Sequence, residues 1–164
     1  MILELKKLFA GAEESIPFDY AMDLSGTEVD NAYPFVSPIR VTGTAAAKDG
    51  FAELSVRAEY VFSIPCDRCT RQITQNCVNS FSHVLVSKLE NEEDDRFFEV
   101  PDGRLDLDAL VREDILLGLP TKFLCRDDCK GICPVCGRNL NDGPCGCGRQ
   151  PGALGFDVLK DFIQ

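Results

Sequence analysis

The sequence predicts an α+β protein with an antiparallel, open or barrel-like β-sheet, one or two helices and a cysteine-rich C-terminal region. Three observations predict this class. Apolar and polar residues alternate along 51–64, apolar residues recur at helical spacing over 106–118, and six of the nine cysteines lie close together near the C-terminus. A chain of 164 residues can bury a sizeable core, so we expect a single domain over 1–164, with a cysteine-rich subregion at about 121–150.

The strands are expected in the first half of the chain. The clearest is 51–64, where every second residue is apolar and the others are mostly polar, which is typical of a half-buried antiparallel strand. An Asp-Gly turn precedes it and predicts a hairpin with a partner strand at 38–47. Further strands are expected at 16–24 and 72–87.

Two side chains of the strand at 72–87 are assigned structural roles. Cys77 lies on the predicted inward face and is interpreted as a small buried apolar residue rather than a metal ligand. His83, the only histidine, has the same parity and is interpreted as a structural residue. The acidic run at 90–95 is expected to be a solvated loop, and 97–100 a short strand.

The helix at 106–118 has recognisable ends. Asp106 is the expected N-cap, and Pro120 ends the helix because proline cannot continue it. The inward stripe is expected to consist of Leu107, Leu110, Val111, Ile115 and Gly118. A second amphipathic helix is expected at 154–163.

The cysteine spacing is typical of a zinc-knuckle C-terminal region. In the segment 133–137, which reads CPVCG, two thiols flank a tight turn, and the glycine lets backbone amides turn toward sulfur. Cys66 and Cys69 form a second Cys-x-x-Cys at a predicted hairpin tip. Disulfides are the competing interpretation. The N-terminal residues lack the pattern of an export signal, and the number of cysteines is odd, so we expect a cytoplasmic protein with reduced thiols.

The number of cysteines fits two four-thiolate sites once Cys77 is set aside. The other eight form the pairs Cys66/Cys69, Cys125/Cys129, Cys133/Cys136 and Cys145/Cys147. The last two pairs are close enough in sequence to form a local site, and the first two would then join the hairpin tip to the tail. The alternative is one zinc site in the tail and a separate Cys66/Cys69 dithiol. The sequence leaves open whether one or two Zn²⁺ ions bind.

The charge distribution limits the class of partner. The chain has a formal net charge of −10, which disfavours broad nucleic-acid binding, and no apolar run approaches the roughly 20 residues that span a bilayer. Five basic and three acidic residues make the window 121–150 positive by two charges, so the remainder carries −12. Within this window, Arg126, Lys130 and Arg138 are candidate contacts to RNA or to another partner. The competing interpretation is that they only screen the zinc thiolates.

Three segments resemble the bacterial YceD family, which is named for large ribosomal RNA subunit accumulation. The string LCRDDCKGICPVCGRNLN at 124–141 is similar to the tail of that family, and PCDRC at 65–69 is similar to its central Cys-x-x-Cys element. The string DALVREDILLGLP at 108–120 resembles the helix before the tail. The resemblance covers about 60–148, whereas 1–59 resembles the family only in the order of its strands.

The resemblance implies a non-catalytic factor in 23S rRNA accumulation or processing and in assembly of the large ribosomal subunit. The implied partner is large-subunit rRNA or a pre-ribosomal particle, contacted directly or through a basic ribosomal protein or processing factor. Neither a membrane nor a small-molecule substrate is expected. Two alternatives come from other classes of protein: a thiol oxidoreductase using Cys66 and Cys69, and a zinc-ribbon adaptor in another complex.

Overall fold

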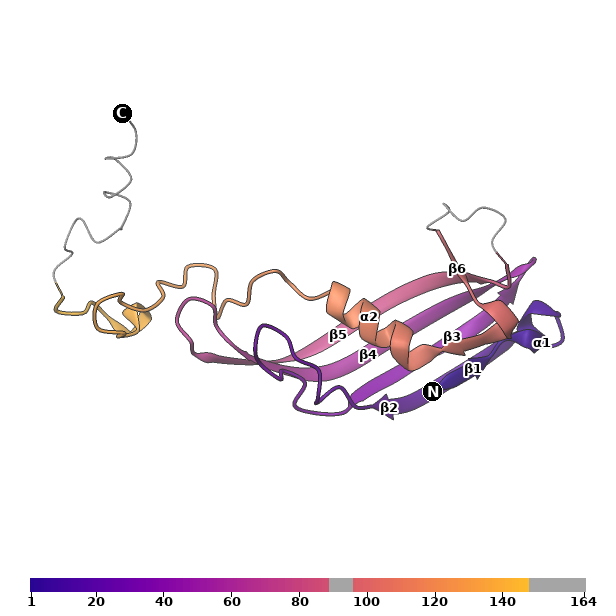
Figure 1. The fold of residues 1–164 in the computed structure, drawn as a ribbon, viewed down its shortest axis with the longest axis horizontal. Helices are drawn as coiled ribbons and strands as arrows, with labels where there is room; N and C mark the ends of the chain where they lie inside the picture. The colour runs from indigo at the N-terminus through magenta and orange to yellow at the C-terminus, as the bar shows by residue number, and fades with distance from the viewer. Residues whose placement is uncertain (89–95, 148–164) are drawn as a thin grey trace, which may run out of the picture.

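A computed structural model describes residues 1–88 and 96–147, which fold as a curled, half-barrel sheet with two α-helices and a C-terminal tail (Figure 1). The α+β class predicted from the sequence is confirmed. The strands are β1 (Ile2–Glu4), β2 (Ser15–Met22), β3 (Ile39–Lys48), β4 (Phe51–Pro65), β5 (Gln72–Val86), β6 (Phe97–Glu99) and β7 (Arg104–Asp106). The helices are α1 (Lys6–Phe9) and α2 (Leu107–Leu117), with short 3-10 turns at η1 (Pro101–Gly103) and η2 (Leu140–Asp142).

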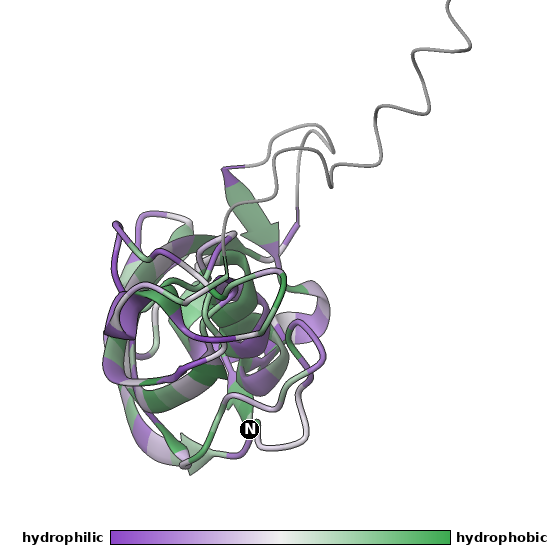
Figure 2. Cartoon of the chain, turned by 90° about the vertical axis from the view of Figure 1, so that its left-hand side faces the viewer, coloured by the Kyte–Doolittle hydropathy of each residue, from purple (hydrophilic) through white to green (hydrophobic). Residues whose placement is uncertain are grey.

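The main sheet has the strand order β2-β3-β4-β5-β6. Neighbours from β2 to β5 pair antiparallel, as predicted, whereas β6 pairs parallel with the end of β5. The hairpin of β4 and β5 is the longest feature of the sheet, because both strands run for 15 residues from the turn that contains Cys66 and Cys69. Viewed from the tail side in Figure 2, the sheet curves around α2.

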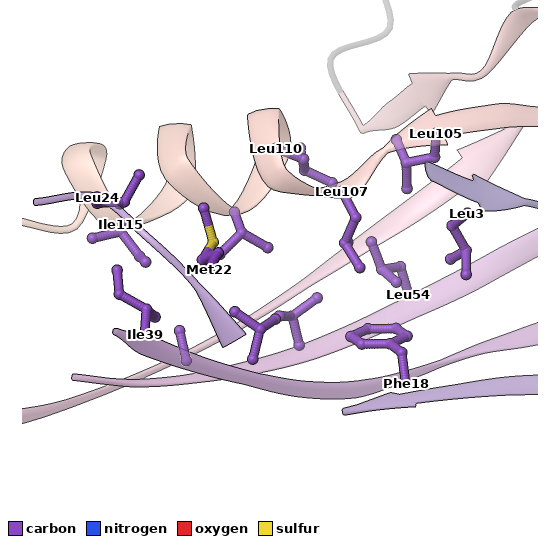
Figure 3. Close-up of a cluster of buried hydrophobic side chains, with 14 of the residues drawn as sticks. Leu3, Phe18, Met22, Leu24, Ile39, Leu54, Leu105, Leu107, Leu110 and Ile115 are labelled. Atoms are coloured by element: carbon purple, nitrogen blue, oxygen red, sulfur yellow. The ribbon is translucent and has the colours of Figure 1, made fainter. Parts of the chain in front are cut away.

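The core lies between the concave face of the sheet and α2. Every second residue of β4 from Ala52 to Ile64 is buried, which confirms the alternation predicted for this strand. Leu107, Leu110 and Ile115 of α2 are buried with the strand residues, and they point toward the sheet in Figure 3. Burial of such side chains typically contributes roughly 1.5–3 kcal/mol each.

The ends of α2 agree with the sequence. Asp106 is the N-cap, and its carboxylate accepts a hydrogen bond from the Ala109 N–H at 3.3 Å. The helix ends at Leu117, before Pro120. The helix expected at 154–163 and the acidic run at 90–95 lie outside the described residues. Neither described helix has the length and apolar composition needed to cross a bilayer.

Two features of the fold were not predicted. Strands β1 and β7 form a small antiparallel sheet of their own, and α1 follows β1 directly.

Cys77 packs against the core but is only partly buried, so its predicted apolar role holds with less burial than expected. His83 forms a hydrogen bond of 2.7 Å with Asp114 of α2, which satisfies the imidazole as a structural residue.

Candidate metal centres

Eight cysteines converge in two groups of four, each with its sulfur atoms within 4.8 Å of one another. The first centre contains Cys66, Cys69, Cys125 and Cys129, and the second contains Cys133, Cys136, Cys145 and Cys147. This grouping corresponds to the two-site interpretation of the sequence. Cys77 belongs to neither group.

The first centre joins the tip of the β4–β5 hairpin to the segment that follows α2. The sulfur atoms of Cys66 and Cys129 are 3.9 Å apart, and those of Cys69 and Cys125 are 3.6 Å apart. At a Zn–S distance of about 2.3 Å, tetrahedral geometry separates the sulfurs by about 3.8 Å. Both observed distances lie close to that value, so this donor set fits a Zn²⁺ ion.

The hairpin turn also binds the tail through the two residues between its cysteines. Asp67 donates its backbone N–H to the carbonyl of Phe123 at 2.9 Å, and its carboxylate accepts the Phe123 N–H at 2.7 Å. The ring of Phe123 stacks on Phe62 of β4, with centroids 5.4 Å apart. Arg68 donates to the carbonyl of Cys129 at 3.0 Å. The first centre is therefore enclosed by backbone and aromatic contacts as well as by its thiols.

Burial and hydrogen bonds shift the pKa values of Cys66 and Cys125 in opposite directions. Burial raises the pKa of Cys66, but backbone N–H donors, chiefly that of Cys125 at 3.4 Å, outweigh it and lower this pKa to about 6. Burial and the hydrogen bond with Cys69 raise the pKa of Cys125 to about 12. The four sulfurs lie close together, and a divalent cation that binds them would replace the thiol protons.

The second centre is formed by a short stretch of the tail. The Cys133 N–H donates to the Arg138 carbonyl at 2.8 Å, and the Gly137 N–H donates back to the Cys133 carbonyl at 2.9 Å. Gly137 has φ of 71°, a left-handed conformation that glycine adopts without strain. This is the tight knuckle that the CPVCG motif predicts. Cys133 is buried, but Cys136 is exposed and the other two thiols are half-buried.

In the second centre, the pKa values of Cys133 and Cys147 are likewise shifted in opposite directions. Backbone N–H groups of Cys136 and Val135 lower the pKa of Cys133 to about 6. A hydrogen bond with Cys136, together with burial, raises the pKa of Cys147 to about 12. The second centre therefore also places four sulfurs close enough together to bind one divalent cation.

Asn141 connects the two centres. Its amide N–H₂ donates to the Cys129 sulfur at 3.3 Å and to the Asn139 side chain at 2.8 Å. Its amide oxygen accepts the Lys130 N–H at 2.9 Å and a guanidinium N–H of Arg126 at 2.6 Å. A side chain on η2, next to the second centre, thus reaches a sulfur of the first.

The three basic candidates of the sequence differ in their surroundings. All are exposed. Arg126 is held by Asn141 and by Asp128, the latter at 3.2 Å. Among the described residues, no side-chain ion pair is seen for Lys130 or Arg138. These two cations are therefore the better candidates for an external contact.

Asp67, Arg68 and Asn141 are the site residues that sequence reasoning missed. Asp67 and Arg68 lie between the two cysteines of the Cys-x-x-Cys motif. That position was the one feature of the sequence that indicated their closeness to the site. Asn141 lies in a polar stretch with glycine and proline between Cys136 and Cys145, which is typical of a turn. Its contact with Cys129 spans 12 positions of the chain, and no sequence pattern indicates that contact.

Comparison with known proteins identifies related sequences. A family model described as large ribosomal RNA subunit accumulation protein YceD matches residues 54–163. The chain is 25% identical over 174 residues to the Arabidopsis thaliana protein named large ribosomal RNA subunit accumulation protein YCED homolog 1, chloroplastic, covering 88% of this chain and 54% of that protein. It is 25% identical over 130 residues to the uncharacterized protein YlbN of Bacillus subtilis, covering 77% of this chain and 76% of that protein.

A third relative matches a shorter part of the chain. The uncharacterized protein ML1660 of Mycobacterium leprae is 32% identical over 81 residues, covering 46% of this chain and 36% of that protein. The chain thus spans about half the length of the Arabidopsis relative and a smaller share of the mycobacterial one. No solved structure matches the chain significantly.

Proposed function

Because the chain belongs to the YceD family, we propose that it is a non-catalytic factor that supports the accumulation or processing of 23S rRNA and the assembly of the large ribosomal subunit. The observation that carries this proposal is the match over 54–163, which includes most of the β4–β5 hairpin, α2 and both cysteine centres. The relative from Arabidopsis, whose name refers to large ribosomal RNA subunit accumulation, supports the same role.

Zinc is assigned a structural role in both centres. Four thiolates complete the coordination of Zn²⁺, so the ion would hold the chain together and leave no open position for a substrate. In the first centre, the four cysteines would fix the tail to the hairpin tip. In the second centre, the four cysteines would order the tight turn at 133–137. Val135 in this turn is 71% exposed and adds nothing to the core.

The charge of the protein favours a pre-ribosomal particle over naked RNA as the partner. The formal net charge is −10, and each four-thiolate zinc site would add −2. Lys130 and Arg138 lie on the positive tail, where a small RNA contact can form. The larger negative surface suits a basic ribosomal protein or a basic processing factor. We place this activity in the cytoplasm.

The burial of the first centre argues against a thiol oxidoreductase. Cys66 is 1% exposed and Cys69 is 3% exposed, so a protein disulfide cannot reach either sulfur. Both thiols also have a cysteine of the tail within 4 Å. Reactive thiols of redox enzymes are at least partly accessible. This arrangement supports a metal ligand role for the hairpin cysteines.

Depletion of the protein tests the proposed function. We expect mature 23S rRNA to fall relative to 16S rRNA, and an added wild-type copy to restore the ratio. A Lys130→Glu/Arg138→Glu variant should restore it only in part while it keeps its zinc. Arg126 is left unchanged because it holds Asn141. A Lys6→Glu/Arg112→Glu variant makes the same charge change at exposed positions on α1 and α2, outside the tail, and should restore the ratio fully. An unchanged ratio after depletion would remove the ribosomal assignment.

A further inference from the structure

Strand β5 has a long free edge. It pairs with β4 from Gln72 to Leu85, which is all but its last residue, but on its other side it pairs with β6 only at 84–86. Within the part of the chain that the structure describes, no strand lies beside β5 between Gln72 and His83. Figure 1 shows β5 reaching well beyond the short β6.

The hydrogen bonds at the two ends of β5 show which backbone groups point away from β4. Val100 N–H donates to the carbonyl of Val86 at 2.8 Å, so that carbonyl faces outward. At the other end, Cys66 N–H donates to the carbonyl of Arg71 at 2.9 Å, so that carbonyl faces β4. Because the direction alternates along an antiparallel strand, even-numbered residues of β5 face outward. The free backbone groups belong to Thr74, Asn76, Val78, Ser80 and Ser82.

This edge lacks the features that normally protect an edge strand. Natural proteins place lysine, other charges, proline or bulges on exposed edges to prevent pairing with other chains. The opposite edge of the sheet, β2, has both Pro17 and Asp19. By contrast, β5 has no lysine, arginine, aspartate, glutamate or proline over its 15 residues. The β2 edge therefore carries residues that oppose pairing with another strand, whereas the described free edge of β5 can accept one.

The chemistry of the edge defines what can occupy it. A row of alternating N–H and C=O groups is matched by the backbone of another extended polypeptide and not by a nucleic acid. Inward-facing side chains such as Cys77 and Phe81 are only partly covered, whereas their neighbours on β4 are buried. On the outer face, Val78 is 51% exposed at the middle of the free edge. An added strand with apolar residues at alternate positions would cover Cys77 and Phe81 on the inward face and place its other side chains on the outer face, beside Val78.

We propose that the free edge of β5 binds an extended, basic segment of a partner protein by β-strand addition. The net charge of −10 selects a basic segment and disfavours pairing with a second copy of this chain. The inference rests on the proposed function in one respect only: a basic ribosomal protein or processing factor would supply the segment. Tests of the edge itself do not depend on that function.

Hydrogen exchange on the full-length, zinc-loaded protein tests the edge directly. The probe is a peptide of alternating lysine and valine, and the control is a peptide of alternating glutamate and valine. We expect the lysine peptide to slow exchange at the five outward amides by about tenfold or more, with the odd-numbered amides unchanged because they already bond to β4. The glutamate peptide should have no such effect.

Substitutions at Val78 separate edge pairing from other binding. Val78→Pro removes an outward N–H and no bond to β4, so it should abolish protection by the peptide. Val78→Thr keeps that N–H and a β-branched side chain, and it should preserve protection. Should the proline variant fail to fold, Val78→Lys keeps every bond of the sheet and repels a basic strand, so it should also abolish protection.

Several results would overturn the proposal. These are unchanged exchange with the lysine peptide, equal protection by the acidic peptide, or slow exchange of the outward amides in the free protein. Protection that grows with protein concentration alone would assign the edge to a second copy. In depleted cells, Val78→Pro should fail to restore the rRNA ratio that Val78→Thr restores. Full restoration by Val78→Pro would overturn the edge alone, whereas a normal ratio after depletion would remove only the proposed function.

Discussion

The two cysteine centres use the same ligands for different structural tasks. In the first centre, 63 residues separate Cys66 from Cys129, and the ligands come from a strand hairpin and from the segment after α2. In the second, all four ligands come from one short stretch of the tail. The first centre therefore brings together segments that are distant in sequence, whereas the second lies within one local turn.

The surroundings of the two centres follow the same division. Three of the four cysteines of the first centre are buried, and Asp67 and Phe123 add backbone and aromatic contacts around it. Only Cys133 of the second centre is buried. Loss of a ligand should therefore spread through the fold from the first centre and remain local at the second. The following predictions test this difference.

Cys66→Ser should have the largest effect. We expect zinc content to fall from about two ions to about one, and the tail to separate from the hairpin tip, because metal affinity is folding free energy where the metal joins distant segments. Hydrogen exchange should accelerate in both 66–72 and 121–131. Cys77→Ser is the matched control, since Cys77 lies on the same hairpin outside both centres and this variant should keep two ions. Loss of both ions from Cys66→Ser would show that the centres are not separate.

Cys133→Ser should have a smaller and more local effect. We again expect the loss of about one zinc ion, but faster exchange only within 131–147, with the sheet and 66–72 unchanged. A chelator should also remove the ion of the second centre first from the wild-type protein, because its thiols are more exposed. Cooperative unfolding of the whole chain in Cys133→Ser would contradict the division between the centres.

Local patterns account for the parts of this fold that the sequence predicted. Alternation along β4, the Asp-Gly turn before it and the Asp106 cap of α2 are each set within a few residues, so each was predicted. Strands β1 and β7 have three residues each and exist only through pairing across about 100 positions of the chain. Such short strands carry no periodicity to detect.

The candidate site shows the same limit. The cysteine spacing singled out the eight cysteines that cluster in the structure, but the choice between one group and two depended on which distant pairs meet. Asp67 and Asn141 were missed because their partners are backbone or sulfur atoms 56 and 12 positions away. A side chain that bonds a distant backbone group resembles any other polar residue in the sequence. Such roles require the three-dimensional structure.

Asn141→Ala tests the connection between the centres. The substitution removes the N–H donor to Cys129 and the acceptor for Lys130 and Arg126, so we expect a loss of about 1–2 kcal/mol in the free energy of unfolding. Zinc should leave the first centre faster, while the total content at saturation stays at about two. Asn76→Ala, at an exposed position of β5 outside both centres, is the control. An unchanged rate of zinc release would mean that Asn141 does not couple the two centres.

Arg71→Ala should have the smallest effect, although the ion pair it removes also joins the hairpin to the tail. Arg71 donates to Asp142 at 2.7 Å, but both side chains are more than half exposed. Exposed ion pairs are screened by water and salt, so we expect Tm to fall by at most about 2 °C and zinc content to stay constant. Asp142→Asn should behave alike, and the double variant should add little, because either change removes the same pair. If Arg71→Ala loosened the tail as much as Asn141→Ala, the ion pair would have to be counted among the main attachments of the tail, and the first centre would lose its special role.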